Sequence, residues 1–556
     1  MLARAHHMAA FLLGVALPGI ACAQAPATSA PSPSVACEAL ADMAVPDARI
    51  VSADPVETSG FMPPSIPPYA PDLAQRTATL PAFCRVEAVA LPTSDSKIGI
   101  EVWLPLRDWN GRMLGTGNGG PGGSIAYAMG MVEGLKRGFA VVNSDLGTAP
   151  DINLTVDHPE RWTDFGHRAT HEMTRVAKLM VRSFYKVDSF GSYFAGCSTG
   201  GQQALSEATR YPDDYDGILA VAPGNNRTHV ATSFLWSYNA LNATSESALS
   251  AADWSLVNRA VLDACAGKDG GSPGDVFLTD PRQCRFNPDT LPKCTSGTSG
   301  DACLTEPQLA TVRRIHAGPT NPRTGERIYA PLTLGSEDQP LGPVEQGDPV
   351  VWPAQQFYPF KWAFGADFTP ASFDFDRDLD RLDALLASPL NANSADLSAF
   401  ARRGGKLMLF SGLADPAVPF EEVVNYYERV VASRGDLEAT QSFARLFLVP
   451  GMGHCFGGPG VTDFGQPFSS AVPPEQAADA LMTLVEWSEK GVAPNTVIAT
   501  KAAGRNAPTA PAGQRPLCAY PKLPEYTGGD PENLSSFRCV EHERGSPMTP
   551  ATRYLN

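Results

Sequence analysis

The chain has 556 residues and 43% hydrophobic residues, which is enough for one large domain with an insertion or for two domains around a sizeable core. Its net charge of −16 at pH 7 argues against nucleic acid or an anionic membrane as a partner. The 50 glycines and 50 prolines indicate a loop-rich surface, and nothing in the composition sets the oligomeric state.

The N-terminus is typical of an exported protein. A basic start, a short apolar run and a small-residue cleavage pattern before Gln24 predict a signal peptide over residues 1–23. The apolar run is too short to span a membrane stably. The alternative, a lipoprotein anchored through Cys22, is disfavoured because Gly19 stands where a larger aliphatic residue is usual. Residues 24–36 are rich in alanine, proline and serine and predict a flexible tether, so we expect a secreted or periplasmic protein.

If the protein is exported to an oxidising compartment, its cysteines are expected to form disulfides. Of the eleven cysteines, removing Cys22 leaves ten, an even number that favours disulfides. The cysteines lack the paired short spacings and neighbouring histidines of a zinc site. Pairing by proximity, with one bridge crossing the chain, predicts five bonds: Cys37–Cys84, Cys265–Cys284, Cys294–Cys303, Cys518–Cys539 and Cys197–Cys455.

The first part of the folded chain contains strand-like runs. Runs at 84–91 and 98–105 suit the antiparallel edge of a sheet, and a further strand begins at 113–116. It leads into a glycine-rich loop that no Lys-Ser/Thr pair follows, so a phosphate-binding loop is disfavoured. In an α/β-hydrolase an early loop of this kind donates an N–H to the oxyanion hole, and we assign that role to Gly119 or Gly120.

The stretch Gly196-Cys197-Ser198-Thr199-Gly200 matches G-x-S-x-G. An aromatic strand-like run precedes it and good helix-forming residues follow it, which is the strand–turn–helix arrangement of a nucleophile elbow. The motif alone is weak evidence in a glycine-rich chain. If it is catalytic, Ser198 is the nucleophile and the Thr199 N–H is the second oxyanion donor.

Strand–helix alternation continues to about residue 224, stops over 225–397, and resumes at a strand over 405–412. We therefore predict an α/β-hydrolase catalytic domain from 37–224 and 398–545, with 225–397 inserted as a lid domain. Asp415 follows the resumed strand, and His454 follows the next strand, at 444–450.

The order Ser198, Asp415, His454 is the α/β-hydrolase order of a catalytic triad. Cys197 precedes the serine and Cys455 follows the histidine. A disulfide between these two cysteines would hold nucleophile and base close together, as nucleophilic catalysis requires.

These residues together resemble the tannase/feruloyl esterase family, which includes mono(2-hydroxyethyl) terephthalate hydrolases. The resemblance spans roughly residues 37–540 and implies an α/β-hydrolase core, a lid over the site, and hydrolysis of esters of aromatic acids. The matching stretches are Gly196-Cys197-Ser198-Thr199-Gly200-Gly201, Tyr215-Asp216-Gly217-Ile218, Leu413-Ala414-Asp415, Val449-Pro450-Gly451-Met452-Gly453-His454-Cys455 with the glycines after it, and Arg515-Pro516-Leu517-Cys518.

The predicted lid departs from the family pattern in two places. The family has a calcium loop of the form Cys-Asp-x-x-Asp-Gly-x-x-Asp-Gly, but here Ala266 replaces the first aspartate. Asp269, Asp275 and the Phe277 carbonyl remain as candidate ligands of a structural Ca²⁺. Terephthalate-type members clamp the substrate carboxylate with a lid arginine, whereas residues 328–376 contain no arginine.

The prediction is a secreted serine esterase that hydrolyses feruloyl- or galloyl-type esters of phenolic acids through an acyl-enzyme, without a redox cofactor. A neutral phenolic ester is favoured over a terephthalate monoester. Aromatic residues at 357–364 supply either an aromatic wall of the site or core packing. A serine peptidase on the same fold and a non-catalytic binding protein are the rival interpretations.

Overall fold

A computed structural model describes residue 33 and residues 35–295, 302–348, 356–467, 476–501 and 513–555. The predicted signal peptide, Cys22 and nearly all of the predicted tether lie outside the described residues. No described helix is both long enough and apolar enough to cross a membrane.

A nine-stranded sheet forms the centre of the fold, in the order β1-β2-β3-β5-β4-β6-β7-β8-β9. The strands from β1 to β5 pair antiparallel, and those from β5 through β9 pair parallel, so the sheet is the mixed sheet of an α/β-hydrolase. The antiparallel edge predicted for the first runs is confirmed. The strands are β1 (Ala48–Val56), β2 (Phe83–Ala90), β3 (Ile98–Pro105), β4 (Arg112–Thr116), β5 (Ala140–Ser144), β6 (Gly191–Cys197), β7 (Gly217–Val221), β8 (Lys406–Gly412) and β9 (Ala444–Val449).

Helices cover both faces of this sheet because its parallel strands are apolar on both sides. Along β8, Leu407 and Leu409 belong to the apolar cluster that contains residues of α4, α5 and α14, while Met408 and Phe410 belong to the cluster that contains residues of α2 and α16. The strand alternation of period two thus produces two separate cores. These helices are α2 (Met131–Lys136), α4 (Ala169–Tyr185), α5 (Thr199–Arg210), α14 (Phe420–Arg434) and α16 (Ala480–Lys490).

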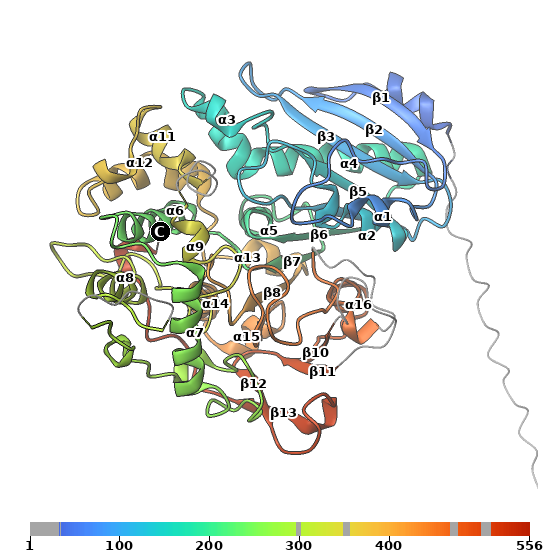
Figure 1. Cartoon of the computed structure of the whole chain (residues 1–556). Helices are drawn as coiled ribbons and strands as arrows, with labels where there is room; N and C mark the ends of the chain where they lie inside the picture. The colour runs from blue at the N-terminus through green and yellow to red at the C-terminus, as the bar shows by residue number, and fades with distance from the viewer. Residues whose placement is uncertain are drawn as a thin grey trace, which may run out of the picture.

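The segment inserted between β7 and β8 contains helices joined by long irregular stretches such as 266–295 and 318–342. Figure 1 shows α6, α8, α11 and α12 gathered on one side of the molecule, away from β1 and β2. Its helices are α6 (Arg227–Leu241), α7 (Ala251–Cys265), α8 (Glu306–Ala317), α9 (Pro343–Gln346), α11 (Tyr358–Phe364) and α12 (Asp378–Leu390).

The five predicted disulfide pairings are confirmed. Short helices and strands complete the chain. Two small antiparallel sheets near the C-terminus lie below the large sheet in Figure 1. The remaining helices and strands are α1 (Leu73–Thr77), α3 (Pro159–Thr163), α13 (Ser398–Arg402), α15 (Leu437–Gln441), β10 (Thr496–Thr500), β11 (Gln514–Cys518), β12 (Lys522–Tyr526) and β13 (Phe537–Glu541).

Candidate active site

Ser198 occupies the sharp turn between β6 and α5. Its φ of 62° lies in a region that residues with a Cβ adopt rarely, and such strain is typical of a nucleophile elbow. The turn is tight because its neighbours are glycines: a Cβ on Gly196 would lie 2.4 Å from the Gly200 carbonyl oxygen. The elbow therefore presents Ser198 at the carboxyl edge of the parallel strands, as the motif predicts.

Asp415 and His454 form the acid–base pair at the same edge. The Asp415 Oδ2 atom lies 2.8 Å from His454 Nδ1, and Oδ1 accepts hydrogen bonds from the N–H groups of Ala417 and Val418 at 2.8 and 2.9 Å. Asp415 is fully buried, so these donors satisfy a carboxylate that water does not reach. A proton on Nδ1 leaves Nε2 of the histidine as the base.

The disulfide between Cys197 and Cys455 joins the elbow to the histidine loop, with the two Cα atoms 5.8 Å apart. Ser198 and His454 border one cavity. No direct hydrogen bond joins their side chains in this structure, and in free enzymes this contact is commonly longer than in the substrate complex.

The glycine loop after β4 lies against the start of α5. Asn118 anchors it, since its N–H donates to Gln203 Oε1 and its carbonyl accepts from the Gly200 N–H, both at 2.8 Å. The backbone N–H groups of Gly119, Gly120 and Thr199 donate to no protein acceptor among the described residues. The structure therefore places the three candidate oxyanion donors in the loop and at the helix end beside Ser198, and Gly119 and Gly120 border the same cavity as Ser198.

The cavity has a volume of about 720 Å³, within the range of small-molecule sites. Its mouth and walls come from the strand-end loops, from α6 and from the segment around α9. Its apolar wall contains Met129, Val230, Phe234, Leu341, Val418 and Phe456, and its polar side chains include Ser124, Arg227, Gln339, Glu345 and Gln356.

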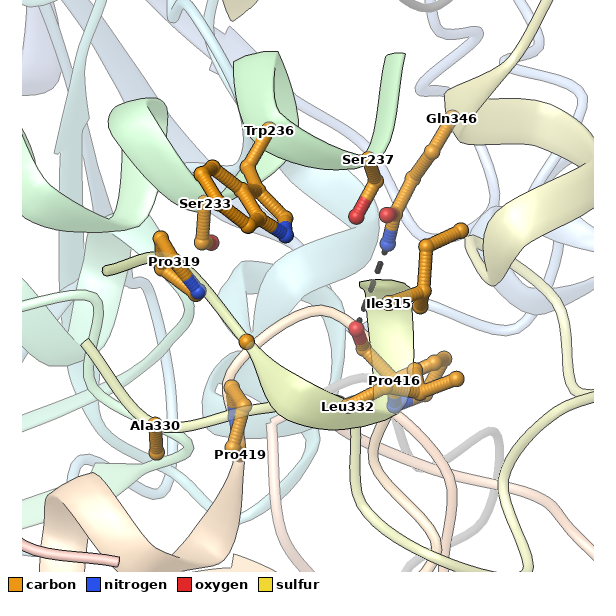
Figure 2. A pocket seen from close by; sticks show the side chains of 11 residues that line it. Ser233, Trp236, Ser237, Ile315, Pro319, Ala330, Leu332, Gln346, Pro416 and Pro419 are labelled. Carbon is orange, nitrogen blue, oxygen red and sulfur yellow. Dashed lines mark hydrogen bonds between the residues drawn. The ribbon is translucent and has the colours of Figure 1, made fainter. Parts of the chain in front are cut away.

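A second, smaller cavity of about 20 Å³ lies behind the acid loop, with room for about one water molecule. Figure 2 shows Trp236, Ile315 and Pro416 around it, with Gln346 donating from Nε2 to the Pro416 carbonyl at 3.2 Å. This contact ties the inserted segment to the residue that follows Asp415. The small cavity cannot hold an ester substrate, so the large cavity is the active-site candidate.

Comparison with known proteins shows the family to which the chain belongs. The model of the family described as "Tannase and feruloyl esterase" matches residues 84–540. An uncharacterised esterase of Xanthomonas campestris pv. campestris is 38% identical over 549 residues, covering 93% of each chain, and a probable feruloyl esterase B-2 of Aspergillus terreus is 32% identical over 82% of this chain and 86% of its own. The chain belongs to the tannase and feruloyl esterase family. It is a carboxylic ester hydrolase.

Solved structures agree with this membership. Feruloyl esterase B from Aspergillus oryzae superposes with a TM-score of 0.80 at 27% identity, over 91% of this chain and 99% of its own. Tannin acyl hydrolase from Aspergillus niger has a TM-score of 0.69 at 22% identity, over 90% and 92% of the two chains, which shows the shared fold.

Asp269 and Asp275, which remain as candidate ligands from the family's calcium loop, are not arranged to bind calcium in this structure. Both oxygens of Asp275 accept from the Arg515 guanidinium, at 2.6 and 2.9 Å, and that guanidinium lies 5.1 Å over the Phe277 ring. Asp269 Oδ2 accepts the N–H groups of Thr279 and Asp280. Calcium needs six or more oxygen ligands, and no group of three or more acidic, histidine or cysteine side chains within the described residues could hold a metal.

The aromatic residues at 357–364 pack in the protein core. Phe357, Tyr358, Phe360 and Trp362 are buried in the large hydrophobic cluster, and none of them borders the active-site cavity. The aromatic rings of Tyr, Phe and Trp that border the cavity are instead those of Phe234 on α6, of Phe456, and of Tyr69 from the loop before α1.

Sequence reasoning assigned no role to Arg227 or to the two glutamines of α5. Arg227 is the first residue of α6, six residues after the end of β7, and it borders the cavity. Its position gave a usable signal, since functional groups of α/β folds gather just after the carboxyl ends of parallel strands.

Proposed function

We propose that this esterase is a secreted serine hydrolase that cleaves esters of aromatic, phenolic acids through an acyl-enzyme. The observation that carries the proposal is the shared cavity, which Ser198, His454, Gly119 and Gly120 border, with Asp415 behind His454 and with Thr199 next to Ser198. This is the set of groups that nucleophilic ester hydrolysis requires.

In the proposed mechanism His454 Nε2 takes the Ser198 proton as the serine oxygen attacks the ester carbonyl. The new oxyanion accepts hydrogen bonds from the backbone N–H groups of Thr199 and of Gly119 or Gly120. His454 then gives the proton to the leaving alcohol, and Asp415 stabilises the charged imidazole. Water, activated by His454, attacks the acyl-enzyme and releases the aromatic acid.

The apolar lining supports an aromatic acyl group as the substrate class. Rings and aliphatic side chains such as Phe234, Val230 and Met129 can pack against a planar ring, and burial of such a ring is favourable at about 25 cal/mol per Å². Relatives named feruloyl esterase support the same class. Export is supported by the five disulfides, which persist in oxidising compartments.

A terephthalate monoester is the second candidate, and one observation favours it. Although residues 328–376 lack an arginine, Arg227 brings a guanidinium to the cavity from the other end of the inserted segment. A guanidinium is a suitable partner for a substrate carboxylate.

A panel of substrates tests the proposal with wild-type protein and Ser198→Ala. The panel contains methyl ferulate, methyl gallate, mono(2-hydroxyethyl) terephthalate and the amide of ferulic acid. We expect turnover of the phenolic esters by the wild type, none by the variant, and little cleavage of the amide. Equal turnover of the amide would support the peptidase interpretation, and turnover by Ser198→Ala would refute the serine mechanism.

A further inference from the structure

Arg227 is a buried cation at the active-site cavity. Only 5% of the residue is exposed, and it forms no ion pair with a carboxylate in the part of the chain that the structure describes. Buried arginines are usually paired with an acid, because removing a charge from water is costly. The burial of Arg227 without an acidic partner therefore needs a functional explanation.

The side chain of Arg227 is held by polar contacts from α5. Its Nε donates to Gln202 Oε1 at 2.8 Å, and its Nη2 donates to Thr199 Oγ1. Gln202 is itself fixed, since its Nε2 donates to the Leu390 carbonyl at 2.6 Å at the end of α12. The guanidinium also lies 5.5 Å over the ring of Phe165. These contacts leave it little freedom to follow a substrate.

The contact with Thr199 sets the direction of a hydrogen-bond chain. A guanidinium can only donate, so the Thr199 oxygen accepts from Arg227 and its single hydrogen is left for another acceptor. That hydrogen goes to the Gly120 carbonyl, with an oxygen–oxygen distance of 2.8 Å. The chain thus runs from Arg227 through Thr199 to the glycine loop.

Two members of this chain belong to the proposed oxyanion hole. Thr199 and Gly120 are two of the three residues whose free N–H groups face the developing anion in the proposed mechanism. Gly120 has a φ of +53°, and its carbonyl belongs to the peptide that joins it to Pro121. The Thr199 contact therefore fixes the peptide next to the one that carries the Gly120 N–H, together with the bonds from the Gly122 N–H to the Gly119 carbonyl at 3.2 Å and from Thr148 Oγ1 to the Pro121 carbonyl at 3.0 Å.

We infer that Arg227 is a positioning residue that holds the oxyanion donors at their working separation through the Thr199 hydroxyl. This inference rests on the proposed serine mechanism. The charge of Arg227 also suits the site. Arg227 has no carboxylate partner among the described residues, and in the proposed mechanism a negative charge enters the cavity when the tetrahedral oxyanion forms. Interactions that strengthen only in the transition state raise kcat rather than lower KM.

The test compares Arg227→Met, Arg227→Lys, Thr199→Val and Thr199→Ser with the wild type on methyl ferulate. We expect Arg227→Met and Thr199→Val each to lower kcat by about 10- to 100-fold, somewhat less than direct loss of an oxyanion donor, with KM within about twofold. Arg227→Lys and Thr199→Ser should recover part of the loss. The double variant Arg227→Met/Thr199→Val should be no slower than the slower single variant, since the two residues act in one chain.

A transition-state readout separates positioning from a structural role. Phenylboronic acid forms a tetrahedral adduct with an active serine, so its Ki should rise by the factor by which kcat falls, whereas the Ki of ferulate should stay nearly constant. Thr199→Val removes no charge and little volume, so it carries the test if Arg227→Met does not fold.

Two results would overturn the inference. One is an unchanged kcat in folded Arg227→Met or Thr199→Val. The other is a loss confined to the KM of mono(2-hydroxyethyl) terephthalate, which would make Arg227 a substrate anchor. Failure of the serine mechanism itself would be seen separately, as active Ser198→Ala or as wild-type protein that a fluorophosphonate does not label at Ser198.

Discussion

Cys197 and Cys455 are joined by a disulfide that spans 258 residues of sequence and brings their Cα atoms to 5.8 Å. Each cysteine is the immediate neighbour of a catalytic candidate, Ser198 on one side and His454 on the other. The bond thus fixes the relative position of nucleophile and base from the backbone, in a place where two separate loops of the sheet edge meet.

The first prediction follows from this bridge. Cys197→Ala/Cys455→Ala should lose at least about tenfold in kcat, because small displacements of a base from its nucleophile are costly. It should also lose stability, by about 5 kcal/mol in the chain-entropy model for so long a loop. Steady-state kinetics and thermal unfolding measure the two effects.

Cys518→Ala/Cys539→Ala is the matched control, since this bridge spans 21 residues and joins two strands near the C-terminus. It should lower the Tm while leaving kcat close to wild type. Equal kcat losses in the two double variants would show that the catalytic bridge acts only as a general staple.

The second prediction concerns Asp415. Asp415→Asn keeps the size of the side chain but offers an amide where His454 Nδ1 donates, so the histidine is held in the wrong tautomer. By comparison with the same change in a serine-protease triad, kcat should fall by about 10³- to 10⁴-fold. Kinetics on methyl ferulate measure the loss, and an unaltered circular dichroism spectrum shows that the fold is intact. A loss below tenfold would remove Asp415 from the triad.

The third prediction is a pH dependence of stability that arises at the start of α14. Burial raises the pKa of Glu421 to about 8 and that of Glu422 to about 7, with Asp280 opposing ionisation of Glu421 and Arg282 favouring it. Glu421 Oε2 has no partner within the described residues. The folded protein therefore keeps protons that the unfolded chain has released, and its stability falls as the pH rises from about 4.5 to about 8.

Glu421→Gln removes the part of this titration that belongs to Glu421 and leaves that of Glu422, so it should raise the Tm by about 2–4 °C at pH 8.5 and change it little at pH 5. Thermal unfolding across this pH range measures the difference. Glu438→Gln, at an exposed position of α15, should shift the Tm at neither pH. A Glu421→Gln variant that gains nothing at pH 8.5 contradicts the assigned pKa direction.

The fourth prediction tests whether the charge of Asp275 is balanced by Arg515 or by a calcium ion. Arg515 and Asp275 are both at least nine-tenths buried, and loss of one partner of such a pair costs about 3–5 kcal/mol. Arg515→Met should therefore unfold several degrees lower, and added calcium should not restore it. The chelator EDTA should leave the wild-type Tm unchanged.

Arg313→Met is the control for this change, because its pair with Asp289 is largely exposed and should contribute little. A fall in the wild-type Tm on chelation, reversed by calcium, would establish the metal site that the family pattern suggests.

The sequence was sufficient to predict the residues whose chemistry depends on local spacing. The elbow glycines, the order of Ser198, Asp415 and His454, and the pairing of Cys197 with Cys455 can all be read along the chain. Each of these signals is a local pattern of a few residues, and the fold brings the patterns together across as many as 258 residues of sequence because parallel strands end at one edge.

The supporting network could not be predicted in this way. Arg227 and Gln202 meet because the first residue of α6 reaches the first turn of α5, and the position of Phe234 depends on how α6 packs against α8 and α12. Composition and spacing in the inserted segment also left open whether the aromatic residues at 357–364 pack in the core or line the site. That choice depends on which face of α11 meets α12, which is a tertiary property.

Trapping of the acyl-enzyme is the most direct test of the account. Wild-type protein is mixed with 4-nitrophenyl ferulate, quenched in acid within milliseconds and analysed by peptide mass spectrometry. The account predicts a burst of nitrophenol and a feruloyl adduct on Ser198, absent in Ser198→Ala. An adduct on another residue, or hydrolysis with neither burst nor adduct under conditions where deacylation is rate-limiting, would contradict it.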